Sequence, residues 1–450
     1  MLSSPDDPIV ALATPPASSA LAVIRISGAG SLRSLSALLR GAPDLEAAAG
    51  HTIRYAVVLD GTEPVDEVMV AIYQAPRSYT GEQGAEIFCH GGIPVVRHLL
   101  SLLTRSGFRQ AGPGEFTQRA FLNGRMDLTR AEAVNEIVRA RSDRARGLAL
   151  ERLHGAIESR IRSARDALAD VRASLEVMID YPEEELEGDT LNESRLAEAE
   201  ALLAGLAATY RTGRIYQEGV TVAVAGATNA GKSSLFNALL RQDRAIVSEI
   251  HGTTRDWLEG QVSVEGVPVR LFDTAGLRAT VDPLETEGMR RTEEVIRGAD
   301  LVLFLVDATV GVSETDRTHV ERLRADGRPV LLLWNKTDLA VGAPPDGFLP
   351  VSAATGAGLR ALEQAMATAI LGGAAGEPGQ PLIDSERQRD LLQRALAAVA
   401  RFRRARAAGT SADLLAADLT DALDALGEIT GEVSSAEILE RMFASFCVGK

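Results

Sequence analysis

The amino-acid sequence predicts a multidomain protein of α/β and α+β class, in which a doubly wound α/β domain is inserted into a helical domain. Three observations carry this prediction. A glycine-rich turn at residues 226–233 follows the apolar run 220–225. Short apolar runs alternate with helical patterns over residues 219–371. Helical patterns also lie before and after that region. Alternating β and α elements are typical of a mostly parallel sheet covered by helices.

Composition limits the possible classes of protein. The chain has 450 residues, of which 46% are hydrophobic, and a formal net charge of −15. One core does not grow to that size, so we expect roughly two to four domains. The negative charge argues against a broad basic surface that holds nucleic acid through phosphate contacts alone.

Cysteine content and the first residues of the chain predict its compartment. With only Cys89 and Cys447, the sequence offers no disulfide framework and no cysteine metal cluster, which is typical of a reducing compartment. The chain starts without a secretory signal pattern, and no apolar run approaches the ~20 residues that span a bilayer. We therefore expect a soluble, cytoplasmic protein with no membrane partner.

Residues 1–124 are expected to form an α+β domain, because strand-like runs interleave there with a few helical patterns. Alternation and β-branched content predict strands, and apolar spacings of three and four predict helices. The predicted strands are 20–26, 54–59, 65–73 and 85–90, and the predicted helices are 31–39 and 95–105.

Residues 125–215 are expected to form the first part of a helical domain. Nine apolar residues follow each other at spacings of three and four, which predicts one stripe on one long helix. They are Leu150, Leu153, Ile157, Ile161, Ala164, Leu168, Val171, Leu175 and Met178. The acidic run 180–189 contains proline and glycine that break the helix, and we interpret it as a solvated loop rather than a docking site. A second helix is predicted at 191–210.

Residues 216–372 are expected to form the inserted α/β domain, with strands at 220–225, 269–272, 301–306 and 330–334. The run 372–381 has linker composition. Helical patterns return after it, at 387–407, 412–426 and 436–446. Because neither helical stretch is a complete core, we assign 373–450 to the second part of the same helical domain.

Residues 226–233 match the pattern G-x-x-x-x-G-K-[ST], in which backbone N–H groups cradle phosphates. Lys232 is expected to reach the outer phosphates, and the hydroxyl of Ser233 is expected to bind Mg²⁺. A helix begins there, and the positive end of its dipole adds to the attraction. The phosphate-binding residues predicted from this loop are Asn229, Ala230, Gly231, Lys232, Ser233 and Ser234.

Three further motifs follow the loop in an order that predicts a guanine nucleotide. The first, residues 273–276, pairs an aspartate, which can hold Mg²⁺ through water, with a glycine amide that can meet the γ-phosphate. The second, residues 335–338, ends a strand, and the carboxylate of its Asp338 can accept both N–H groups of a guanine edge. The third, residues 352–354, can supply a backbone contact to the guanine oxygen. The predicted residues are Asp273, Thr274, Ala275, Gly276, Asn335, Lys336, Asp338, Ser352, Ala353 and Ala354.

The residue that positions the attacking water has no obvious place in the sequence. Many GTPases carry a glutamine directly after the glycine of the first motif. Here that residue is Leu277, which cannot orient water. Glu285 lies in a polar, glycine-containing stretch, and we take it as the water-positioning residue. A solvated carboxylate at the start of a helix is the alternative, and Glu287 and Glu259 are competitors for the role.

The segments that close over the phosphates are expected to supply metal ligands. The stretch 252–256 contains hydroxyl groups, one of which can hold Mg²⁺ and be withdrawn after hydrolysis. The phosphate loop, residues 226–233, contains no arginine that could stabilise the transition state as an arginine finger does. Asn229 can instead offer a side-chain oxygen to a monovalent cation, with backbone carbonyls of 248–253 closing over it. An asparagine there is also an ordinary turn residue.

Taken together, these motifs resemble the MnmE (TrmE) family of tRNA-modifying GTPases. The resemblance extends over nearly the whole chain rather than over the nucleotide-binding segment alone. It rests on N-terminal motifs at residues 13–16, 25–28, 79–82, 90–92, 113–117 and 119–124, and on C-terminal motifs at 426–433 and 446–450.

The resemblance implies a homodimer of three-domain chains. The N-terminal domain would bind folate and dimerise, and a helical domain would carry a Ras-like P-loop G domain. The two G domains would approach each other in a K⁺-dependent way during GTP hydrolysis. By this resemblance Asn229, Ser248, Ile250 and Thr253 surround K⁺, Ser233 and Thr254 bind Mg²⁺, and Glu285 positions the water. Ser248, Thr253 and Thr254 also join the GTP-binding residues.

The resemblance further implies a partner and a substrate. The family acts with MnmG, which uses FAD and NADH, to add a carboxymethylaminomethyl or aminomethyl group to C5 of the wobble uridine of certain tRNAs. The one-carbon unit comes from a tetrahydrofolate derivative, either 5-formyl- or 5,10-methylene-tetrahydrofolate.

Arg25, Glu82, Arg125 and Lys450 match the folate-site positions of the family. A folate offers a pterin edge to a carboxylate and an anionic glutamate to basic groups. For Arg25 an outward position on an alternating strand is the alternative, and for Lys450 a solvated terminus. Where the family has a Gly-Arg-Gly-like turn after paired prolines, this sequence has residues 17–19 as Ala-Ser-Ser, which puts local geometry near the folate site in question.

Two other classes of function compete with this one. A ribosome-assembly or other RNA-binding regulatory GTPase would carry a basic RNA-binding module beside its G domain. The stretch 387–406 is rich in arginine, but we interpret it as a solvated helix face. A purely structural or signalling GTPase dimer would not need Arg25, Glu82 and the Cys-Val-Gly-Lys terminus.

Overall fold

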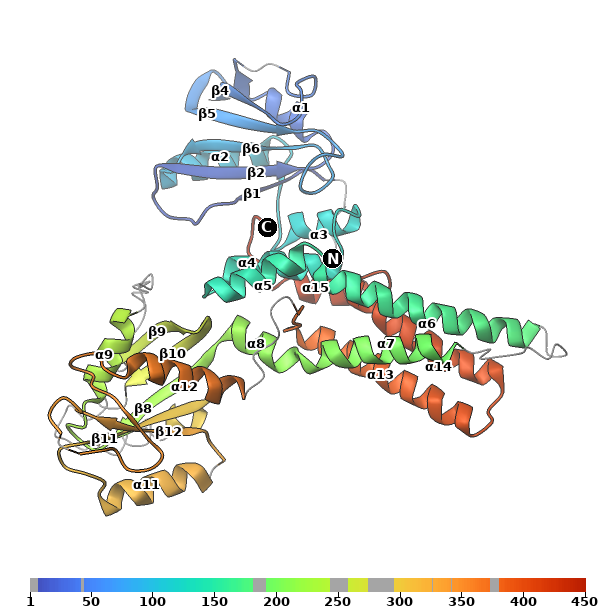
Figure 1. Ribbon diagram of the computed structural model, residues 1–450. Helices are drawn as coiled ribbons and strands as arrows, with labels where there is room; N and C mark the ends of the chain where they lie inside the picture. The colour runs from blue at the N-terminus through green and yellow to red at the C-terminus, as the bar shows by residue number, and fades with distance from the viewer. Residues whose placement is uncertain are drawn as a thin grey trace, which may run out of the picture. The chain divides into compact units, whose positions relative to one another are not determined.

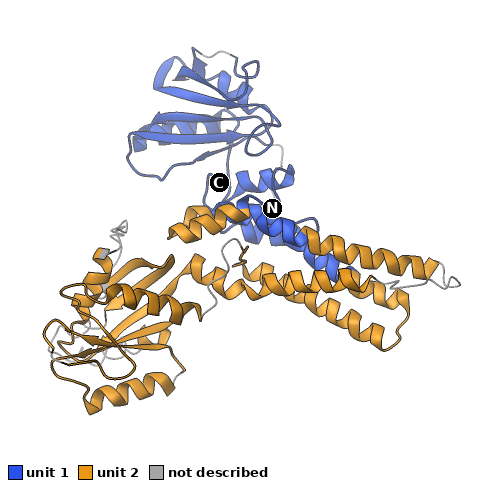
Figure 2. Ribbon diagram, viewed as in Figure 1, with its two compact units in different colours: residues 1–135, 153–161, 420–450 blue, residues 136–152, 162–419 orange. Residues whose placement is uncertain are grey.

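The computed structural model describes residues 7–41, 44–180, 192–242, 258–273, 295–325, 327–340, 342–372 and 380–450. The contacts divide the chain into two compact units, coloured in Figure 2. Unit 1 comprises Met1–Asn135, Leu153–Ile161 and Thr420–Lys450, and unit 2 comprises Glu136–Arg152 and Arg162–Leu419. Each unit therefore contains segments that are far apart in the sequence. The division into residues 1–124, 125–215, 216–372 and 373–450 stays a prediction.

Unit 1 is built on a mixed sheet of seven strands in the order β3-β4-β5-β6-β2-β1-β7 (Figure 1). Helices α1 (Ser31–Ser36) and α2 (Ile93–Arg105) accompany it. The strands are β1 (Ile9–Leu12), β2 (Leu21–Ser27), β3 (Leu39–Arg40), β4 (Thr52–Asp60), β5 (Glu63–Tyr73), β6 (Gly84–His90) and β7 (Arg109–Gln110). The predicted strands and helices of this region are thus present, with ends shifted by a few residues.

The alternation of side chains along β2 decides where its arginine lies. Ala22, Ile24 and Ile26 are buried in the core that also contains residues of α2. Since successive side chains of a strand point to opposite faces, Val23 and Arg25 lie on the other face of the sheet. Arg25 is only partly buried there. The strand thus places a cation on the face that α2 does not cover.

In the rest of unit 1, the C-terminal residues of the chain pack with helices of the N-terminal region. The remaining helices are α3 (Glu115–Leu122), most of α4 (Leu128–Arg139), the start of α6 (Ala156–Asp180), the end of α14 (Ala412–Thr430), and α15 (Ala436–Phe443). Leu128 and Ala131 pack with Phe443 and Phe446. Pro113 forms a β-bridge with Val448. The last residues therefore pair with the loop that precedes α3.

Unit 2 contains a sheet of six strands in the order β13-β12-β11-β8-β10-β9. They are β8 (Val220–Gly226), β9 (Leu258–Val264), β10 (Val267–Asp273), β11 (Leu301–Asp307), β12 (Val330–Asn335) and β13 (Phe348–Pro350). All neighbouring pairs are parallel except β9 with β10. The prediction of a mostly parallel sheet is confirmed, with an added antiparallel edge strand.

Helices cover both faces of this sheet. Val222 and Val224 share a core with α9 (Lys232–Gln242) and α12 (Leu359–Leu371). Ala223 and Ala225, which point the other way, share a core with residues of α11 (Glu314–Ala325). This arrangement is the doubly wound fold that the alternating apolar runs predicted.

The other helices of unit 2 are α5 (Asp143–Leu153), most of α6, α7 (Glu193–Ala208), α8 (Tyr210–Glu218), α13 (Glu386–Ala407) and the start of α14. Helix α7 packs along α13, as Figure 1 also shows. Helix α5 reaches the sheet, because Leu148 belongs to the core of that sheet. Its preceding residue Ser142 donates a hydrogen bond from Oγ to the carbonyl of Gly266, at 2.7 Å, in the turn between β9 and β10.

Two helix predictions are wrong in detail. The long apolar stripe is interrupted, because α5 ends at Leu153 and α6 begins at Ala156. Gly155 between them has φ of +89°, and a Cβ atom there would lie 2.6 Å from Nη2 of Arg130. Leu150 and Leu153 therefore lie on α5 and not on the long helix. The helix predicted at 191–210 ends at Ala208, and Tyr210 starts α8.

Several strands went unpredicted. Strands β1, β3, β7 and β13 have two to four residues, which is too short for a periodic signal. Strand β9 reads LEGQVSV, in which Glu259, Gly260 and Gln261 interrupt the apolar pattern. The linker at 372–381 and the acidic run at 180–189 lie largely outside the described residues.

Within the described ranges, no helix is both long and apolar enough to cross a membrane.

Candidate functional site

The phosphate loop joins β8 to α9 and depends on glycine at two positions. Gly226 has φ of +139°, and a Cβ atom there would lie 2.3 Å from the carbonyl oxygen of Leu305. Gly231 has φ of +95°, and a Cβ atom there would lie 2.3 Å from Nδ2 of Asn335. Asn229 also has a left-handed backbone, with φ of +62°, and is exposed. The loop therefore wraps tightly at the start of α9, where N–H groups and the helix dipole favour an anion.

Lys232 is the first residue of α9 and lies folded over its own loop. Its Nζ donates hydrogen bonds to the carbonyl oxygens of Gly226, at 3.0 Å, and Ala227, at 2.7 Å. The residue is only 8% exposed. A buried ammonium needs such acceptors, and these two hold its charge against the first residues of the loop.

Ser233 and Asp273 meet beside the loop. The hydroxyl of Ser233 donates to Oδ2 of Asp273 at 2.6 Å. Asp273 ends β10, which runs parallel to β8, so the two motifs meet at the same edge of the sheet. A hydroxyl and a carboxylate are hard oxygen groups of the kind that Mg²⁺ prefers. These two predicted residues are brought together and fit such an ion.

Asn335 links the phosphate loop to the third motif. It ends β12 and is 1% exposed. Its Nδ2 donates to the carbonyl oxygen of Ala230 at 2.7 Å, and its Oδ1 accepts from the backbone N–H of Ala353 at 3.1 Å. Ser352 Oγ donates to Oδ1 of Asp338 at 2.5 Å. The predicted guanine-side residues thus form one connected cluster next to the loop.

Lys336 directly follows β12 and joins this cluster to the neighbouring strand β11. Its backbone is left-handed, with φ of +66°, and its Nζ lies 2.6 Å from Oδ2 of Asp307 at the end of β11. Partial burial acts to raise the pKa of Asp307, but hydrogen bonds from Lys336 and Thr309 outweigh it and bring that pKa below its usual range. Asp307 was missed from sequence, although a carboxylate at a strand end of a parallel sheet is a usable signal.

Eight predicted residues lie outside the described ranges: Ser248, Ile250, Thr253, Thr254, Thr274, Ala275, Gly276 and Glu285. Their roles stay predictions, as does that of the competitor Glu287. The other competitor, Glu259 on β9, accepts a hydrogen bond from Nε of Arg270 at 3.1 Å and is partly exposed.

A second polar site lies on the sheet of unit 1, around Arg25. Its Nε and Nη2 donate to Oε1 of Glu86, at 2.9 and 2.8 Å, and its Nη1 donates to the carbonyl oxygen of Gly449 at 3.0 Å. Glu86 lies opposite Arg25 in the register of β2 with β6. The rings of Tyr79 and Phe116 lie 5.5 and 5.7 Å from the guanidinium carbon, within cation–π range. The arginine is therefore fixed in place.

Lys450 lies beside this arginine. Burial lowers the pKa of Lys450, and the positive charge of Arg25 lowers it further. Arg25 is paired with Glu86, and the amine of Lys450 is the second cation of this cluster. An anionic group beside that amine would favour its protonated form.

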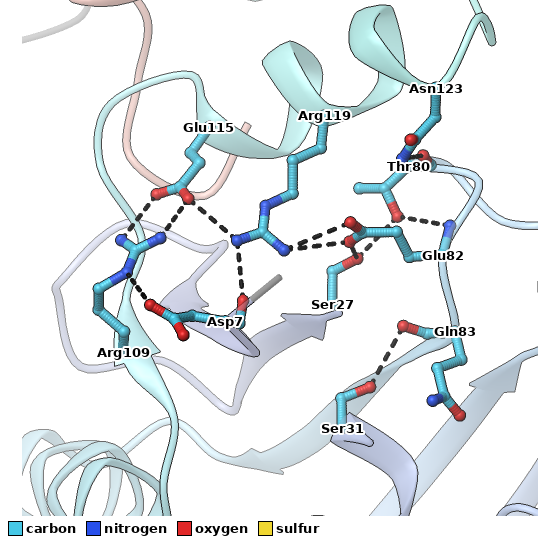
Figure 3. Close-up of polar contacts among 10 residues, drawn as sticks. All are labelled: Asp7, Ser27, Ser31, Thr80, Glu82, Gln83, Arg109, Glu115, Arg119 and Asn123. Atoms are coloured by element: carbon cyan, nitrogen blue, oxygen red, sulfur yellow. Dashed lines mark hydrogen bonds and ion pairs between the residues drawn. The ribbon is translucent and has the colours of Figure 1, made fainter. Parts of the chain in front are cut away.

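Glu82 belongs to an adjoining network, drawn in Figure 3. Its Oε2 accepts from Oγ of Ser27 at 2.7 Å, and its two oxygens lie 3.4 and 3.3 Å from Nη1 of Arg119. Arg125 is exposed, and its side-chain carbons would lie 3.4 Å from a Cβ atom on Gly81, next to Glu82. The structure thus groups Arg25 with Lys450, and places Arg125 beside the loop that carries Glu82.

Sequence reasoning missed the residues that surround these four. They are Tyr79, Glu86, Glu115, Phe116 and Arg119. Glu115 and Arg119 are four residues apart on α3, a spacing that predicts an ion pair on a helix. Glu86 had no such signal, because its partner lies on another strand.

A cavity of about 490 Å³ opens on the opposite, helix-covered side of the same sheet. Its lining is mostly apolar and includes Leu12, Pro15, Pro16, Ala17, Ile93 and Leu100. None of the four predicted folate residues lines it. The unusual turn at residues 17–19 borders this cavity, and Ser19 Oγ donates to the carbonyl of Leu21 at 2.7 Å. The departure from the family pattern therefore lies at the cavity rather than beside Arg25.

The two cysteines differ in environment. Cys89 is buried in the unit 1 core, and burial raises the pKa of its thiol to about 11. Cys447 is exposed, and its thiol is free. Across the described part of the chain, no three His, Cys, Asp or Glu side chains are grouped as a metal site.

A phosphate loop, a hydroxyl–carboxylate pair and a strand-end Asn–Asp cluster at one edge of a parallel sheet define a P-loop nucleotide-binding domain of the GTPase class. Comparison with known proteins agrees with this class. The family model for the MnmE helical domain matches residues 128–447, and the model for the GTP-binding protein TrmE N-terminus matches residues 8–125.

Full-length relatives give the same result. The tRNA modification GTPase MnmE of Moorella thermoacetica is 42% identical over 465 residues, covering 99% of this chain and 100% of the relative. That of Carboxydothermus hydrogenoformans is 39% identical over 462 residues with the same coverage. Among solved structures, a variant of Aquifex aeolicus Era bound to GDP·AlF4⁻ is 25% identical over 40% of this chain and 66% of its own, with a TM-score of 0.29.

The chain belongs to the MnmE family of tRNA modification GTPases. This assignment rests on the family models and the full-length relatives. It confirms the predicted family, the predicted fold class and the prediction of an enzyme that hydrolyses GTP.

Proposed function

We propose that this chain binds and hydrolyses GTP with Mg²⁺ and K⁺, and thereby drives modification of the wobble uridine of certain tRNAs. The single observation that carries the proposal is the end-to-end similarity to tRNA modification GTPases, over 99% of the chain. In this proposal a carboxymethylaminomethyl or aminomethyl group is added to C5 of the uridine, the flavoprotein MnmG is the partner, and the reaction takes place in the cytoplasm.

For the nucleotide, Lys232 would contact the outer phosphates and Asp338 the guanine edge. Ser233 would bind Mg²⁺ directly, with Thr254, and Asp273 would hold it through water. The 2.6 Å contact between Ser233 and Asp273 supports this assignment, because it already places both groups at one point beside the loop.

K⁺ would complete the site. Asn229 is exposed on a left-handed turn, a position from which its side-chain oxygen is accessible to a cation. Ser248, Ile250 and Thr253 would supply the other ligands. We expect GTP turnover to be several-fold or more faster in K⁺ than in Na⁺ at equal ionic strength. Equal turnover in the two salts would overturn the potassium proposal.

Glu285 would position the attacking water. In Glu285→Ala, GTP affinity should change little while turnover falls by about 100-fold or more, since orienting the nucleophile acts in the transition state. Glu287→Ala is the matched control, and it should keep most of the turnover. The reverse outcome would move the role to Glu287.

The N-terminal domain would bind a tetrahydrofolate and form the homodimer. Arg25 and Lys450 would meet the anionic glutamate, and Glu82 would accept from the pterin edge with Arg125 nearby. The half-buried pair of cations beside two aromatic rings supports this assignment.

Nucleoside analysis of tRNA tests the function as a whole. In cells that lack this chain, the C5-modified wobble uridines should disappear, and the wild-type gene should restore them. Unchanged wobble uridines would reject the tRNA function while leaving the GTPase assignment intact.

No observation favours an RNA-binding regulatory GTPase. Several arginines of α13, the candidates for an RNA patch, are engaged within the chain. Arg403 and Arg406 bind Glu193, and Arg401 binds Asp418 at 2.9 Å. A face whose cations already have carboxylate partners has little charge left for phosphates.

A further inference from the structure

A chain of alternating charges begins on β7, passes through α3 and ends at Glu82, in the loop before β6. From its far end it consists of Arg109, Glu115, Arg119 and Glu82, as Figure 3 shows. We infer that Arg119 is a positioning residue that fixes the direction of the Glu82 carboxylate toward a bound ring. The inference rests on the proposed role of Glu82 in binding a tetrahydrofolate.

Arg119 is itself held rigidly. Its side chain is 5% exposed. Its Nη2 donates to the backbone carbonyl of Asp7 at 2.8 Å and to Oε1 of Glu115 at 3.2 Å, while Nη1 faces Glu82. A Cβ atom on Gly28, which has φ of +122°, would lie 3.2 Å from Nη1, so the backbone also borders the guanidinium. A guanidinium with partners on several sides has one orientation.

Glu115 anchors the other side of Arg119. It accepts from Nη2 of Arg109 at 2.5 Å and from the backbone N–H of Gly112 at 2.8 Å. Burial acts to raise the pKa of Glu115, but the hydrogen bonds from Arg109 and Gly112 bring it below its ordinary value. Glu115 therefore stays ionised and keeps Arg119 in place at neutral pH.

The contacts of Glu82 leave one of its oxygens suited to a ligand. Oε2 accepts from Ser27 at 2.7 Å and from Arg119 at 3.3 Å. Among the described residues, the contact of Oε1 is the long one to Arg119, at 3.4 Å. An ionised carboxylate can accept about four hydrogen bonds. Oε1 is thus fixed in direction and can still accept further hydrogen bonds. A carboxylate that accepts the N–H donors of a ring needs both properties.

This geometry predicts a specificity, because a carboxylate fixed in direction discriminates best between rings that differ in their N–H donors. A site built around such a hydrogen bond rejects an analogue that lacks the donor. A lysine in place of Arg119 would keep the charge but lose the planar fork that reaches Asp7, Glu115 and Glu82 together.

The test compares two probes on the full-length chain. One is 5-formyl-tetrahydrofolate, and the other is the same compound without the amino group of its pterin ring. The measured quantity is the ratio of the two dissociation constants. For the wild type the amino compound should bind about tenfold more tightly or better. Glu82→Gln should reduce the ratio to near one.

Arg119→Gln and Arg119→Lys should reduce the ratio severalfold, because each loses the contacts of Nη1 with both carboxylate oxygens and leaves the hydrogen bond from Ser27 to hold Glu82. Arg33→Gln is the matched control, because it makes the same change at an exposed arginine that pairs with Glu46, outside this chain of charges, and it should keep the wild-type ratio. Ser27→Ala removes one hydrogen bond and no charge, and should lower the ratio a few-fold even if the arginine variants unfold.

The outcomes separate two failures. If the wild type binds neither probe, the folate proposal itself is wrong. If the wild type discriminates and Glu82→Gln does not, but the folded Arg119 variants keep the wild-type ratio, the positioning role of Arg119 is overturned. A wild-type ratio in Glu82→Gln would likewise overturn it, because the carboxylate would then not contact the ring.

Discussion

The nucleotide site of unit 2 and the charged site of unit 1 are built in opposite ways. In unit 2 each contributing motif is a short run that ends a strand of one parallel sheet, so neighbouring strands deliver the motifs to the same edge. In unit 1 the contacts of Arg25 join residues separated by 61 and 424 positions along the chain. The nucleotide site is thus formed by short continuous motifs, whereas the unit 1 site is formed by residues that only the fold brings together.

The two sites should respond differently to substitution. The polar groups of the nucleotide site are held mainly by neighbours within the site, as Lys232 is by its own loop. The groups of the unit 1 site are held by alternating charges, of which Arg119 is buried and Glu82 and Glu115 are partly buried. A single substitution in the nucleotide site should therefore change which ligand is bound. A substitution in a buried long-range charge cluster should change the orientation of its side chains or the free energy of unfolding.

The largest expected effect is on nucleotide choice. In Asp338→Asn the carboxylate that would accept two guanine N–H groups becomes an amide with one donor and one acceptor end. GTP affinity should fall by about 100-fold or more, and affinity for the xanthine nucleotide should rise, because a site with unmatched buried polar groups rejects its former ligand. Competition binding measures both.

Asp346→Asn is the control for this substitution, because Asp346 is exposed in the loop before β13. It should leave both affinities unchanged. Retained preference for GTP in Asp338→Asn would contradict the assignment of the guanine edge to that carboxylate.

Unit 2 also contains one buried long-range charge cluster, which tests the comparison from the other side. The Arg152 side chain is 2% exposed, binds Glu136, and lies 2.7 Å from Asp384, 232 positions further along the chain. Arg152→Met removes a buried cation from beside two largely buried carboxylates. The free energy of unfolding should fall by about 3–5 kcal/mol in chemical denaturation.

Arg214→Met provides the matched control, because Arg214 forms an exposed pair with Glu218 one turn away on α8. An exposed pair of that kind contributes less than about 1 kcal/mol. Equal losses of unfolding free energy in the two variants would show that burial of the Arg152 cluster adds nothing to the stability of the protein.

The smallest expected effect is a pH dependence of folate binding. The folded-state pKa of Lys450 lies below its ordinary 10.5, mainly through burial and then through Arg25. An anionic ligand prefers the protonated amine. Affinity should therefore be full below the folded-state pKa, and should fall as pH rises through it, beginning below pH 10.5.

Two substitutions sharpen this pH test. Lys450→Arg keeps a charge throughout the range and should abolish the decline. Lys450→Met should lower affinity by about tenfold at neutral pH, because one charge-assisted contact is lost. A wild-type affinity that stays constant up to pH 10.5 would show that Lys450 does not face the anion.

The predictability of each region follows from this difference. Asn335 and Asp338 were found because their motif is continuous, and the parallel sheet followed from repeated apolar runs. Glu86 and Arg119 were not found, because strand register and helix packing pair them with distant residues. The break at Gly155 was missed since the apolar spacing continues across it, and an isolated glycine lowers helix stability by only about 1 kcal/mol.

The most direct test of the account asks whether both sites serve one reaction. It measures the modified wobble uridine in tRNA from cells whose only copy of this chain is wild type, Asp338→Asn or Arg25→Met. The account predicts full modification with the wild type and background levels with either variant. Wild-type modification in cells that carry Arg25→Met would contradict it, because the charged site of unit 1 would then be dispensable for the tRNA reaction.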